Sequence, residues 1–305
     1  MRIFIRSLFF ALLLWIWVFI KLLANRPKVV HACDLDTLPP CYAYKLLFRK
    51  KLVFDVFDRY GMAIIPQRFK KLCALINYLE EGYGKYSDAL IIAGGQKVLG
   101  TFKKRPKRCE ILLNCPEDYF VNSVRTKCDD HNFKLVYTGG IRRDRALENT
   151  SKAIEDIDMI DFHLAGPIID AEVFDNIQKT FNIKYHGLLQ PHQAISLEGT
   201  SDGLIALYNP ETIWNRLTLP NKLFEAMMCS IPIVTNVANE IINETKCGIL
   251  IEYDNIEQIK QAIITLRDNP ELRKRLGDNG RKAFLEKYNW NIMEDKLYKV
   301  YDDLL

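Results

Sequence analysis

Two glycines followed by a cluster of arginines form the part of the sequence whose residue types best suit a phosphate group. In chain order these residues are Gly139, Gly140, Arg142, Arg143 and Arg145. Paired glycines let the backbone approach a bulky anion, a following helix offers free N–H groups, and each guanidinium can bind a phosphate through two parallel hydrogen bonds. The segment therefore predicts a diphosphate cradle, with an ordinary structural turn as the alternative.

A second candidate site lies between Leu219 and Met227, where a Pro-Asn pair opens a predicted helix. Lys222 stands at the helix start, and Glu225 lies within about its first turn. A carboxylate at this position can accept hydrogen bonds from two ribose hydroxyls. The alternative is a surface glutamate that is placed favourably against the helix dipole. The long loop predicted over 208–219, just before the helix, favours a binding role.

These residues need a scaffold, and the apolar pattern predicts one. Ten short segments rich in β-forming residues alternate with helical stretches, and strands are expected at 28–32, 52–56, 89–93, 110–114, 134–138, 161–165, 183–186, 204–207, 231–235 and 249–252. Such alternation is typical of parallel sheets flanked by helices. Ligands of these sheets bind at the carboxyl ends of the strands, which is where the glycine pair stands. The last helices are expected over 272–286 and 292–304.

Proline positions predict one helix start and one interdomain linker in this scaffold. The helix after the first strand is predicted to have Asp36 or Thr37 as its N-cap, with Pro39 and Pro40 in its first turn. A proline at 116 then breaks the pattern, and the polar stretch 116–131 is predicted to be an interdomain linker.

Composition describes an ordinary folded protein of 305 residues, 49% of them hydrophobic and 26% charged, with a formal net charge of +4. The length suggests two domains, and the aliphatic content excludes a disordered or collagen-like chain. So small a positive balance gives no reason to expect a nucleic-acid partner. Eight cysteines without a CxxC pair are expected to be free thiols in a reducing compartment.

Positive charge concentrates in the first part of the chain, where residues 1–130 carry 22 Lys and Arg against 12 Asp and Glu. Such an excess often marks a surface that meets polyanions or anionic lipid, and solvated faces are the alternative. The apolar run from Leu8 to Ile20 is shorter than a bilayer span. Its Trp15 and Trp17, together with flanking basic residues, favour a helix at a membrane surface over a buried core helix.

Five motifs, in the same order, resemble those of glycosyltransferase family 4, the group 1 glycosyltransferases. They are HACDLDTLPP at 31–40, KLVFDVFDRYG at 51–61, YTGGIRRDRA at 137–146, PNKLFEAMMCSIPIVTN at 220–236 and YNW at 288–290. The resemblance covers nearly the whole chain, and the order of the motifs makes it more specific than any one of them. It implies an α/β protein of GT-B fold with two Rossmann-like, doubly wound domains.

By this resemblance the chain divides into three parts. An acceptor-side domain is expected over 1–130, a donor-binding domain over 131–288, and a C-terminal helix over 289–305 that returns towards the first domain. The first domain is abbreviated at its N-terminus: at about 30 residues for each βαβ unit, roughly 60 residues of the family's usual start are expected to be absent. The remaining strands would then have an uncovered edge.

The resemblance also implies a nucleotide diphosphate sugar as the donor substrate. Its donor-binding residues are expected to be Gly139, Gly140, Arg142, Arg145, Asn221, Lys222, Leu223, Glu225 and Glu240. Arg145 and Glu225, together with His31, are the expected catalytic residues. The family's paired-glutamate motif is incomplete, because Leu217 stands where its first glutamate is expected, and this departure weakens the inferred mechanism.

On the acceptor side, His31, Asp34 and Asp36 lie at the carboxyl end of the first predicted strand, and Asp55 and Asp58 lie at the carboxyl end of the second. The first two aspartates also spell DxD, the metal motif of the other large glycosyltransferase fold. A helix N-cap for Asp36 and an acceptor hydroxyl contact for Asp34 are favoured over it, and a structural role at the strand end is the alternative for His31. No metal or other cofactor is expected, because arginine and helix-end N–H groups can stabilise the leaving diphosphate.

The expected function is sugar transfer, with retention of anomeric configuration, to a lipid-linked or surface-polysaccharide acceptor. The expected location is the cytoplasmic, inner face of the cell membrane, with peripheral membrane contact. Two alternatives stay open from the sequence: a truncated, non-catalytic remnant that still binds nucleotide sugar, and a membrane-associated scaffold protein.

Overall fold

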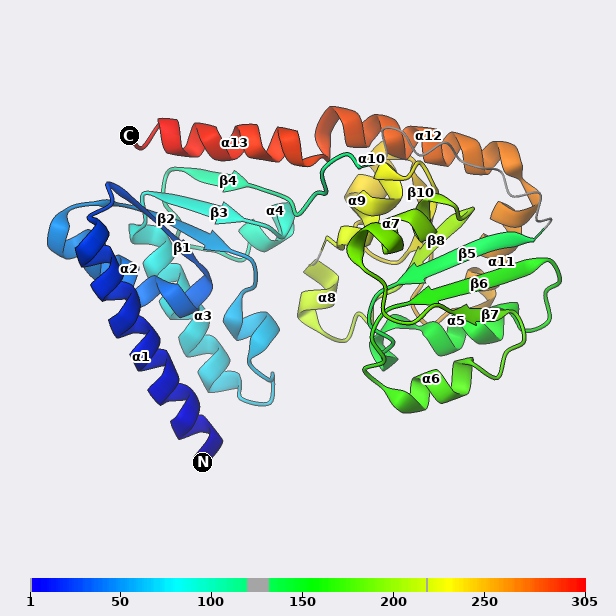
Figure 1. The fold of residues 1–305 in the computed structure, drawn as a ribbon, viewed down its shortest axis with the longest axis horizontal. Helices are drawn as coiled ribbons and strands as arrows, with labels where there is room; N and C mark the ends of the chain where they lie inside the picture. The colour runs from blue at the N-terminus through cyan, green and yellow to red at the C-terminus, as the bar shows by residue number, and fades with distance from the viewer. Residues whose placement is uncertain (1, 120–131, 218) are drawn as a thin grey trace. The chain divides into compact units, whose positions relative to one another are not determined.

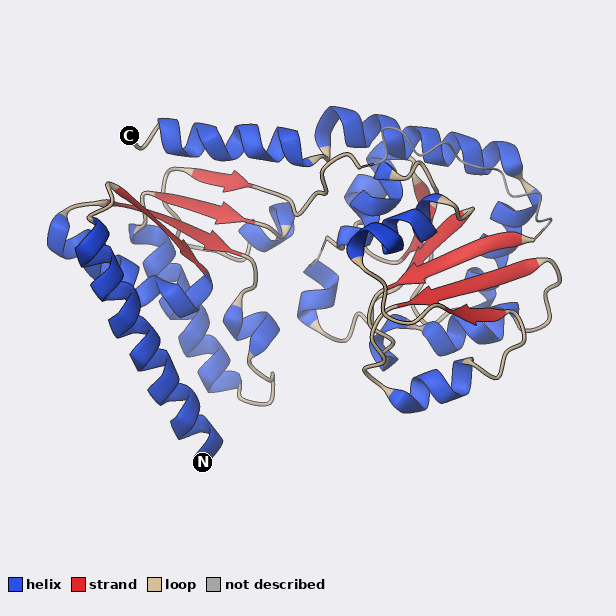
Figure 2. Cartoon of the chain, in the orientation of Figure 1, coloured by secondary structure: helices blue, strands red, loops and turns tan. Residues whose placement is uncertain are grey.

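The computed structural model divides the chain into two compact units, drawn in Figures 1 and 2. It describes residues 2–119, 132–217 and 219–305, with side chains from residue 10 onward. The first unit comprises Met1–Asn114 and Met293–Leu305, and the second comprises Cys115–Ile292. The domain boundary expected at residue 130, and most of the linker expected over 116–131, lie outside the described residues.

The first unit is built on a parallel sheet whose four strands follow chain order, β1-β2-β3-β4. Its elements are α1 (Arg2–Asn25), β1 (Val29–Cys33), α2 (Asp34–Phe48), β2 (Lys51–Val56), the π-helix η1 (Tyr60–Ile64), α3 (Lys70–Tyr86), β3 (Ala89–Ile92), α4 (Gly95–Leu99) and β4 (Cys109–Ile111), with most of α13 (Trp290–Asp302). Crossover helices cover the faces of parallel sheets, so such strands are apolar on both sides, as β2 and β3 are.

The C-terminal helix α13 contributes to the core of the first unit. Its Val300 is fully buried in a cluster with Val53 of β2 and with Ala89 and Ile91 of β3. Leu297 and Tyr301 pack against the same cluster. The end of the chain therefore covers one face of the first sheet, and this contact positions Tyr301 beside the strands.

The second unit holds a six-stranded parallel sheet of order β10-β9-β8-β5-β6-β7. Its elements are β5 (Phe133–Thr138), the 3-10 helix η2 (Arg143–Arg145), α5 (Leu147–Ile154), β6 (Ile160–Ala165), α6 (Ala171–Ile177), β7 (Ile183–Tyr185), α7 (Pro191–Gly199), β8 (Gly203–Ala206), α8 (Ile213–Leu217), α9 (Asn221–Met228), β9 (Ile233–Thr235), α10 (Asn239–Thr245), β10 (Gly248–Leu250), α11 (Ile256–Asp268) and α12 (Pro270–Lys287). The strand order reverses between β5 and β8, which is a topological switch point where such sheets bind ligands.

Helices cover both faces of this second sheet (Figure 1). On one face, α5, α6 and α11 pack into the main core, where Leu135 and Tyr137 of β5 are buried. Successive side chains of a strand point to opposite faces, so Val136 and Thr138 face the other layer, which contains α7 and α9. This second layer is the one that holds the candidate site.

Each of the ten predicted strands overlaps an observed strand, and the predicted helices over 272–286 and 292–304 overlap α12 and α13. The prediction of a loop without structure over 208–219 is wrong. The short helix α8 lies within it, with Asn215 buried and its side-chain amide donating to the carbonyl oxygen of Asn209 at 2.8 Å.

The predicted start of the second helix is also wrong. α2 begins at Asp34 with Cys33 as its N-cap, so that both prolines lie inside the helix. Because Pro40 has no N–H, the carbonyl oxygen of Asp36 loses its usual helical donor. The indole N–H of Trp15 donates to that oxygen at 2.7 Å. A side chain of α1 thus supplies the hydrogen bond that the proline removes.

Helix α1 exposes a number of large apolar side chains. Trp17 is 57% exposed, and Phe10, Ile16 and Ile20 are exposed to a similar degree. Within the described part of the chain, none of the helices is long and apolar enough to cross a membrane. Contact of α1 with a membrane surface stays a prediction.

Candidate functional site

A glycine turn follows β5 directly, at the carboxyl end of the strand, as predicted. Gly139 has a φ of +155°, and its N–H donates to the carbonyl oxygen of Ala165 at 2.8 Å. Gly166 comes so close on the neighbouring turn that a Cβ on it would lie 2.0 Å from the oxygen of Gly139. The Tyr137 hydroxyl donates to the oxygen of Gly140 at 2.8 Å. The turn is therefore tightly held, and its two glycines carry no side chain of their own that would keep an anion from the backbone.

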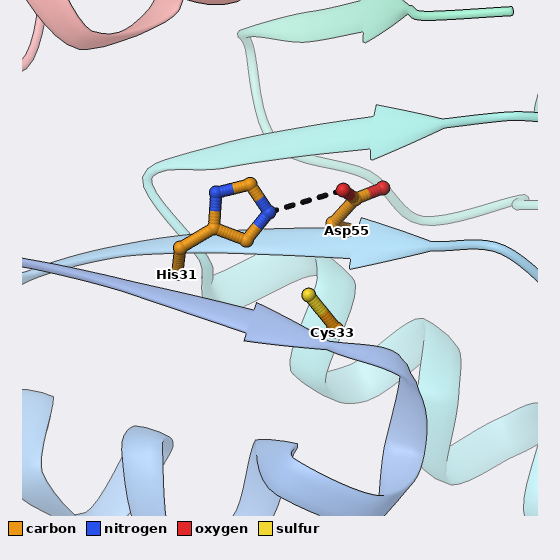
Figure 3. Close-up of side chains that lie close together, drawn as sticks. All are labelled: His31, Cys33 and Asp55. Atoms are coloured by element: carbon orange, nitrogen blue, oxygen red, sulfur yellow. Dashed lines mark hydrogen bonds and ion pairs between the residues drawn. The ribbon is translucent and has the colours of Figure 1, made fainter. Parts of the chain in front are cut away.

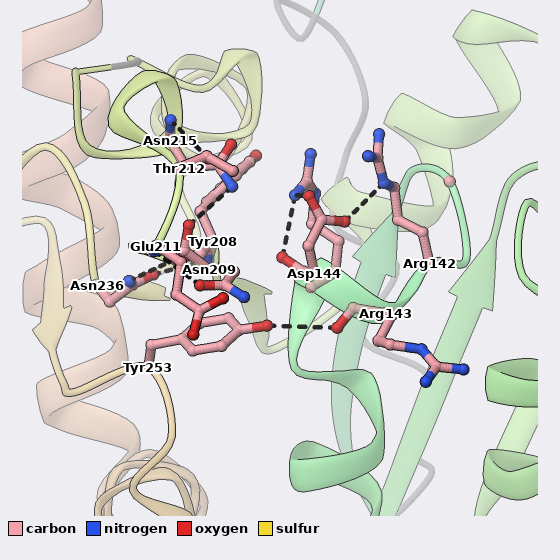
Figure 4. A network of polar contacts seen from close by, with 12 residues as sticks. Arg142, Arg143, Asp144, Tyr208, Asn209, Glu211, Thr212, Asn215, Asn236 and Tyr253 are labelled. Carbon is pink, nitrogen blue, oxygen red and sulfur yellow. Dashed lines mark hydrogen bonds and ion pairs between the residues drawn. The ribbon is translucent and has the colours of Figure 1, made fainter. Parts of the chain in front are cut away.

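Two of the three predicted arginines, Arg142 and Arg145, pair with the carboxylate of Asp144, and Figure 4 shows the first of these pairs. The Arg142 and Arg145 side chains each lie 2.6 Å from Asp144. Arg145 also lies over the ring of Tyr208, at 4.5 Å from its centroid, and is only 17% exposed. Arg143 does not join them: it is 64% exposed and pairs with carboxylates of the α6 region. The structure thus singles out Arg145 as the half-buried cation beside the glycine turn.

The start of α9 meets a buried carboxyl group from α7. Lys222 donates through Nζ to Oε1 of Glu198 at 3.0 Å and also pairs with Glu225, three residues further along α9. Glu198 accepts a further hydrogen bond from the hydroxyl of Thr138, the last residue of β5. The Glu198 side chain has no exposed surface. One buried group therefore joins the glycine turn to the helix that the sequence singles out as a second candidate site.

This arrangement shifts the pKa values of its members. Burial, helped by the nearby Glu225 carboxylate, raises the pKa of Glu198 to about 7, although Lys222 and Thr138 favour the ionised form. Burial disfavours the ammonium of Lys222, but the carboxylates of Glu198 and Glu225 outweigh burial and raise its pKa. Lys222 therefore stays charged, next to a carboxyl group that changes its protonation near neutral pH.

Tyr208 connects the arginine side of the site with α9. Burial raises the pKa of its hydroxyl, while Arg145 on one side and Lys222 on the other act to lower it. Its backbone is held by Asn236, whose side-chain amide accepts from the N–H and donates to the carbonyl oxygen of Tyr208, each at 2.8 Å (Figure 4). The positive charges of Arg145 and Lys222 therefore both act on the hydroxyl of Tyr208, which follows β8 at the switch point between β5 and β8.

The other predicted donor residues differ in their exposure and in their place on the helices. Asn221 is the exposed first residue of α9. The Leu223 side chain is fully buried, and its N–H donates to the oxygen of Pro220 at 3.0 Å, so it supports the helix. Glu240 is exposed in the first turn of α10, after the strand that neighbours β8. Leu217, in place of a glutamate, ends α8.

In the first unit, His31 lies between two polar partners. Its Nε2 is 3.0 Å from Oδ2 of Asp55, and its Nδ1 is 2.5 Å from the hydroxyl of Tyr301. Figure 3 shows His31 and Cys33 on β1 and Asp55 on the neighbouring β2. The sequence indicates Asp55 only as a residue near the end of a strand. Tyr301 is missed entirely because it comes from the other end of the chain.

The two aspartates of the DxD sequence each have a protein partner. Asp34 accepts from the backbone N–H of Phe57 at 2.8 Å, and Asp36 accepts from the hydroxyl of Tyr60 at 2.5 Å. The N-cap role predicted for Asp36 is therefore wrong, because the N-cap is Cys33. Its carboxylate instead connects α2 to η1.

One group of side chains in the described part of the chain is close enough to hold a metal ion. It consists of His31, Cys33 and Asp55, whose donor atoms lie within 4.8 Å of one another. Burial and the carboxylates of Asp55 and Asp34 raise the pKa of the Cys33 thiol, which opposes the thiolate form that binds metals. The seven cysteines that the structure describes form no disulfide with one another, as expected. A metal-free reaction stays a prediction.

Sequence reasoning missed Glu198, Asp144 and Tyr208. No motif marks Glu198, which stands in an ordinary helical segment before a glycine. The signal that could have found it is a carboxylate on a helix face that otherwise packs against a sheet. Tyr208 begins the loop predicted to bind, and Asp144 lies inside the arginine cluster, so both were near predicted sites without being singled out.

Comparison with known proteins shows that the chain is similar to glycosyltransferases. The model of the family "Glycosyl transferases group 1" matches residues 218–283, a segment that includes α9 with Lys222 and Glu225. The chain is 23% identical to an uncharacterized glycosyltransferase of Methanocaldococcus jannaschii, MJ1069, over 98% of this chain and 74% of the relative. It is 24% identical to the capsular polysaccharide biosynthesis glycosyltransferase CapM of Staphylococcus aureus, over 57% of this chain and 47% of CapM.

The fold is similar to that of solved glycosyltransferases. HepE of Anabaena, crystallised with UDP and glucose, superposes with a TM-score of 0.73 over 95% of this chain and 81% of HepE, at 14% identity. Sucrose-phosphate synthase of Thermosynechococcus elongatus gives a TM-score of 0.72 at the same identity. These likenesses establish the GT-B fold. With the group 1 segment at 218–283 and relatives named as glycosyltransferases, the chain is a glycosyltransferase.

Proposed function

We propose that this glycosyltransferase, of family 4, moves a sugar from a nucleotide diphosphate sugar to a lipid-linked or surface-polysaccharide acceptor, with retention of anomeric configuration. The observation that carries the proposal is the contact of Glu198 with both Thr138 and Lys222. That contact joins the glycine turn to the start of α9, so the two segments suited to a diphosphate and to a ribose lie at one site.

In the proposed donor complex, the diphosphate lies against the backbone of Gly139 and Gly140. Arg145 and Lys222 supply positive charge where the leaving nucleoside diphosphate develops negative charge, which is the largest single contribution to such reactions. Glu225 accepts hydrogen bonds from the ribose hydroxyls, as its place in the first turns of α9 allows. With two cations and the backbone N–H groups in place, the reaction requires no metal ion.

The proposed acceptor site lies in the first unit, at the carboxyl ends of β1 and β2. There His31 is held between Asp55 and Tyr301, so that its ring is fixed in orientation. An imidazole held in this way can contact an acceptor hydroxyl. The carboxylates of Asp34 and Asp58, whose pKa values burial raises, add hydrogen-bonding groups for hydroxyls.

Two observations support an acceptor at the inner face of the cell membrane. CapM of Staphylococcus aureus is named for capsular polysaccharide biosynthesis. The exposed apolar side chains of α1, with Trp17 among them, suit peripheral contact with lipid. The basic excess of residues 1–130 would add attraction to anionic headgroups.

Turnover tests this proposal. The chain is incubated with UDP-, GDP- and ADP-sugars and a membrane extract, and release of the free nucleotide is measured. We expect release with one of the donors, reduced about 100-fold in Arg145→Ala. Arg143→Ala, which removes an exposed arginine of the same turn, is the matched control and keeps the rate. Equal rates for the two variants, or no release with any donor, would contradict the proposed enzyme.

A further inference from the structure

Glu198 is a buried carboxyl group that is only partly satisfied. Its Oε1 accepts from Lys222 at 3.0 Å and from Thr138. Among the described residues its Oε2 is buried without a hydrogen-bond partner. A buried carboxyl group with an unpaired oxygen costs free energy, and an apolar residue would fill the space between α7 and the sheet at lower cost. The residue therefore has a role beyond packing.

The groups that face this carboxyl come from two other elements. Thr138 approaches from β5, and Lys222 and Glu225 approach from α9. On α7 itself, His192 is exposed, six residues before Glu198. The ionisable groups of this cluster are thus the ammonium of Lys222 and the carboxyl groups of Glu198 and Glu225. A proton on Glu198 leaves Lys222 and Glu225 as a neutral pair, whereas its loss leaves one negative charge in excess.

A diphosphate placed against Lys222 changes this balance. It brings further negative charge to a buried site, which opposes ionisation of any neighbouring carboxyl group. The most favourable response is uptake of one proton from solvent by Glu198, which forms an O–H bond on the carboxyl. Its carbonyl oxygen still accepts from Lys222, but its negative charge no longer competes with the diphosphate. The ammonium then serves the diphosphate and Glu225.

We propose that Glu198 is a positioning residue of the donor site, which holds Lys222 towards the diphosphate and takes up a proton when the nucleoside diphosphate binds. This inference rests on the proposed function, because it requires a diphosphate at Lys222. Its consequence is a donor affinity that falls as the pH rises above neutrality. The pKa of about 7 for Glu198 in the ligand-free protein sets the start of that fall.

The sign of the effect follows from linkage. Bound diphosphate raises the pKa of Glu198 further, so the complex holds more protons than the free protein above about pH 7. The contribution of Glu198 to the affinity is then constant well below its pKa and decreases about fivefold from pH 7 to pH 8. The terminal phosphate of UDP, with a pKa of about 6, is already ionised in this range and does not contribute to the decrease.

The test is calorimetric titration of the full chain with UDP, the nucleotide in the HepE crystals, in two buffers of different ionisation enthalpy. Near pH 7.5 we expect uptake of roughly three quarters of a proton for each UDP bound. Glu198→Gln keeps a carbonyl oxygen for Lys222 and Thr138, so it should bind UDP within about threefold of the parent at pH 7 but without proton uptake or pH dependence. Glu198→Ala, which cannot hold Lys222, should bind about tenfold more weakly.

His192→Gln is the matched control, since it removes an exposed titratable group from the same helix and should leave proton uptake unchanged. If the parent protein binds UDP with no proton uptake, or if Glu198→Gln retains the uptake, the role of Glu198 is refuted while the proposed donor site stands. If the parent protein binds none of UDP, GDP and ADP, the donor site and the role of Glu198 are refuted together.

Discussion

Lys222 Nζ lies 3.0 Å from Oε1 of Glu198, and the same ammonium pairs with Glu225 on its other side. One cation thus lies between two carboxyl groups that come from different helices. Because Thr138 contacts Glu198 as well, this small cluster fixes the position of α9 relative to the glycine turn. The predictions below depend on that relationship.

Removing the central cation should weaken donor binding. In Lys222→Met the diphosphate loses a charge-assisted hydrogen bond of about 1.5–3 kcal/mol, so the affinity for UDP should fall at least tenfold. Isothermal titration calorimetry measures this affinity. Lys287→Met is the control, because that lysine pairs with Glu244 at an exposed surface of the same unit. Unchanged affinity in Lys222→Met would show that Lys222 does not face the diphosphate.

Glu225 should act on the ribose rather than on the phosphates. Glu225→Gln keeps an oxygen for Lys222 but binds ribose hydroxyls less strongly, because the hydrogen bonds lose their charge. We expect UDP to bind about tenfold more weakly while inorganic pyrophosphate binds as before. Competition of the two ligands in one titration gives both constants. An equal loss for both ligands would mean that Glu225 acts only through Lys222.

Glu198 should make stability depend on pH in an unusual direction. Its pKa is about 7 in the folded protein and has the ordinary lower value of a glutamate after unfolding, so the folded state holds the extra proton in between. The free energy of unfolding therefore falls as the pH rises through this interval. Glu198→Gln should be more stable than the parent by about 1–3 kcal/mol at pH 8 and equal to it near pH 4. Urea unfolding at both pH values measures the difference, and a stability gain independent of pH would contradict the assignment.

Trp15 should stabilise the first unit through its indole N–H. Trp15→Phe keeps most of the apolar surface but leaves the carbonyl oxygen of Asp36 without a donor, which should cost about 0.5–1.5 kcal/mol of unfolding free energy. Trp17→Phe, a change on the exposed face of the same helix, is the control and should be nearly neutral. The two variants are compared by thermal unfolding, and equal effects would remove the role given to Trp15.

The exposed face of α1 should contribute to lipid contact. Trp17→Ser removes an exposed aromatic ring and should reduce co-sedimentation of the protein with vesicles of anionic phosphatidylglycerol by several-fold. Thr180→Ser, a small polar change in the second unit, serves as the control. No binding of the parent protein to such vesicles would contradict the proposed membrane contact.

The sequence was sufficient for the strands because each is a short apolar run bounded by turn residues, as in the segment before Gly139. It failed for the start of α2, where Pro39 and Pro40 indicate a first turn. Pro40 is tolerated inside the helix because Trp15, more than twenty residues away, supplies a donor to the freed carbonyl of Asp36. No local pattern contains that information.

At the candidate site too, residues in local motifs could be predicted and residues defined by contacts between elements could not. Gly139, Arg145, Lys222 and Glu225 stand in local motifs, and the sequence singled them out. Glu198 was missed because its significance depends on the packing of α7 against both β5 and α9. Arg143 was expected to join the cradle, but its neighbours on α6 attract it away from the turn. Contacts between elements, rather than spacing along the chain, decide both cases.

Equilibrium binding of a nucleoside diphosphate tests the central claim most directly. The full chain is titrated calorimetrically with UDP, GDP and ADP, beside Arg145→Ala and Arg143→Ala. The account predicts saturable binding of one nucleotide for each chain for at least one of the three, lost in Arg145→Ala and retained in Arg143→Ala. Absence of binding by the parent protein to all three nucleotides, or equal binding by both variants, would contradict a donor site at the glycine turn and α9.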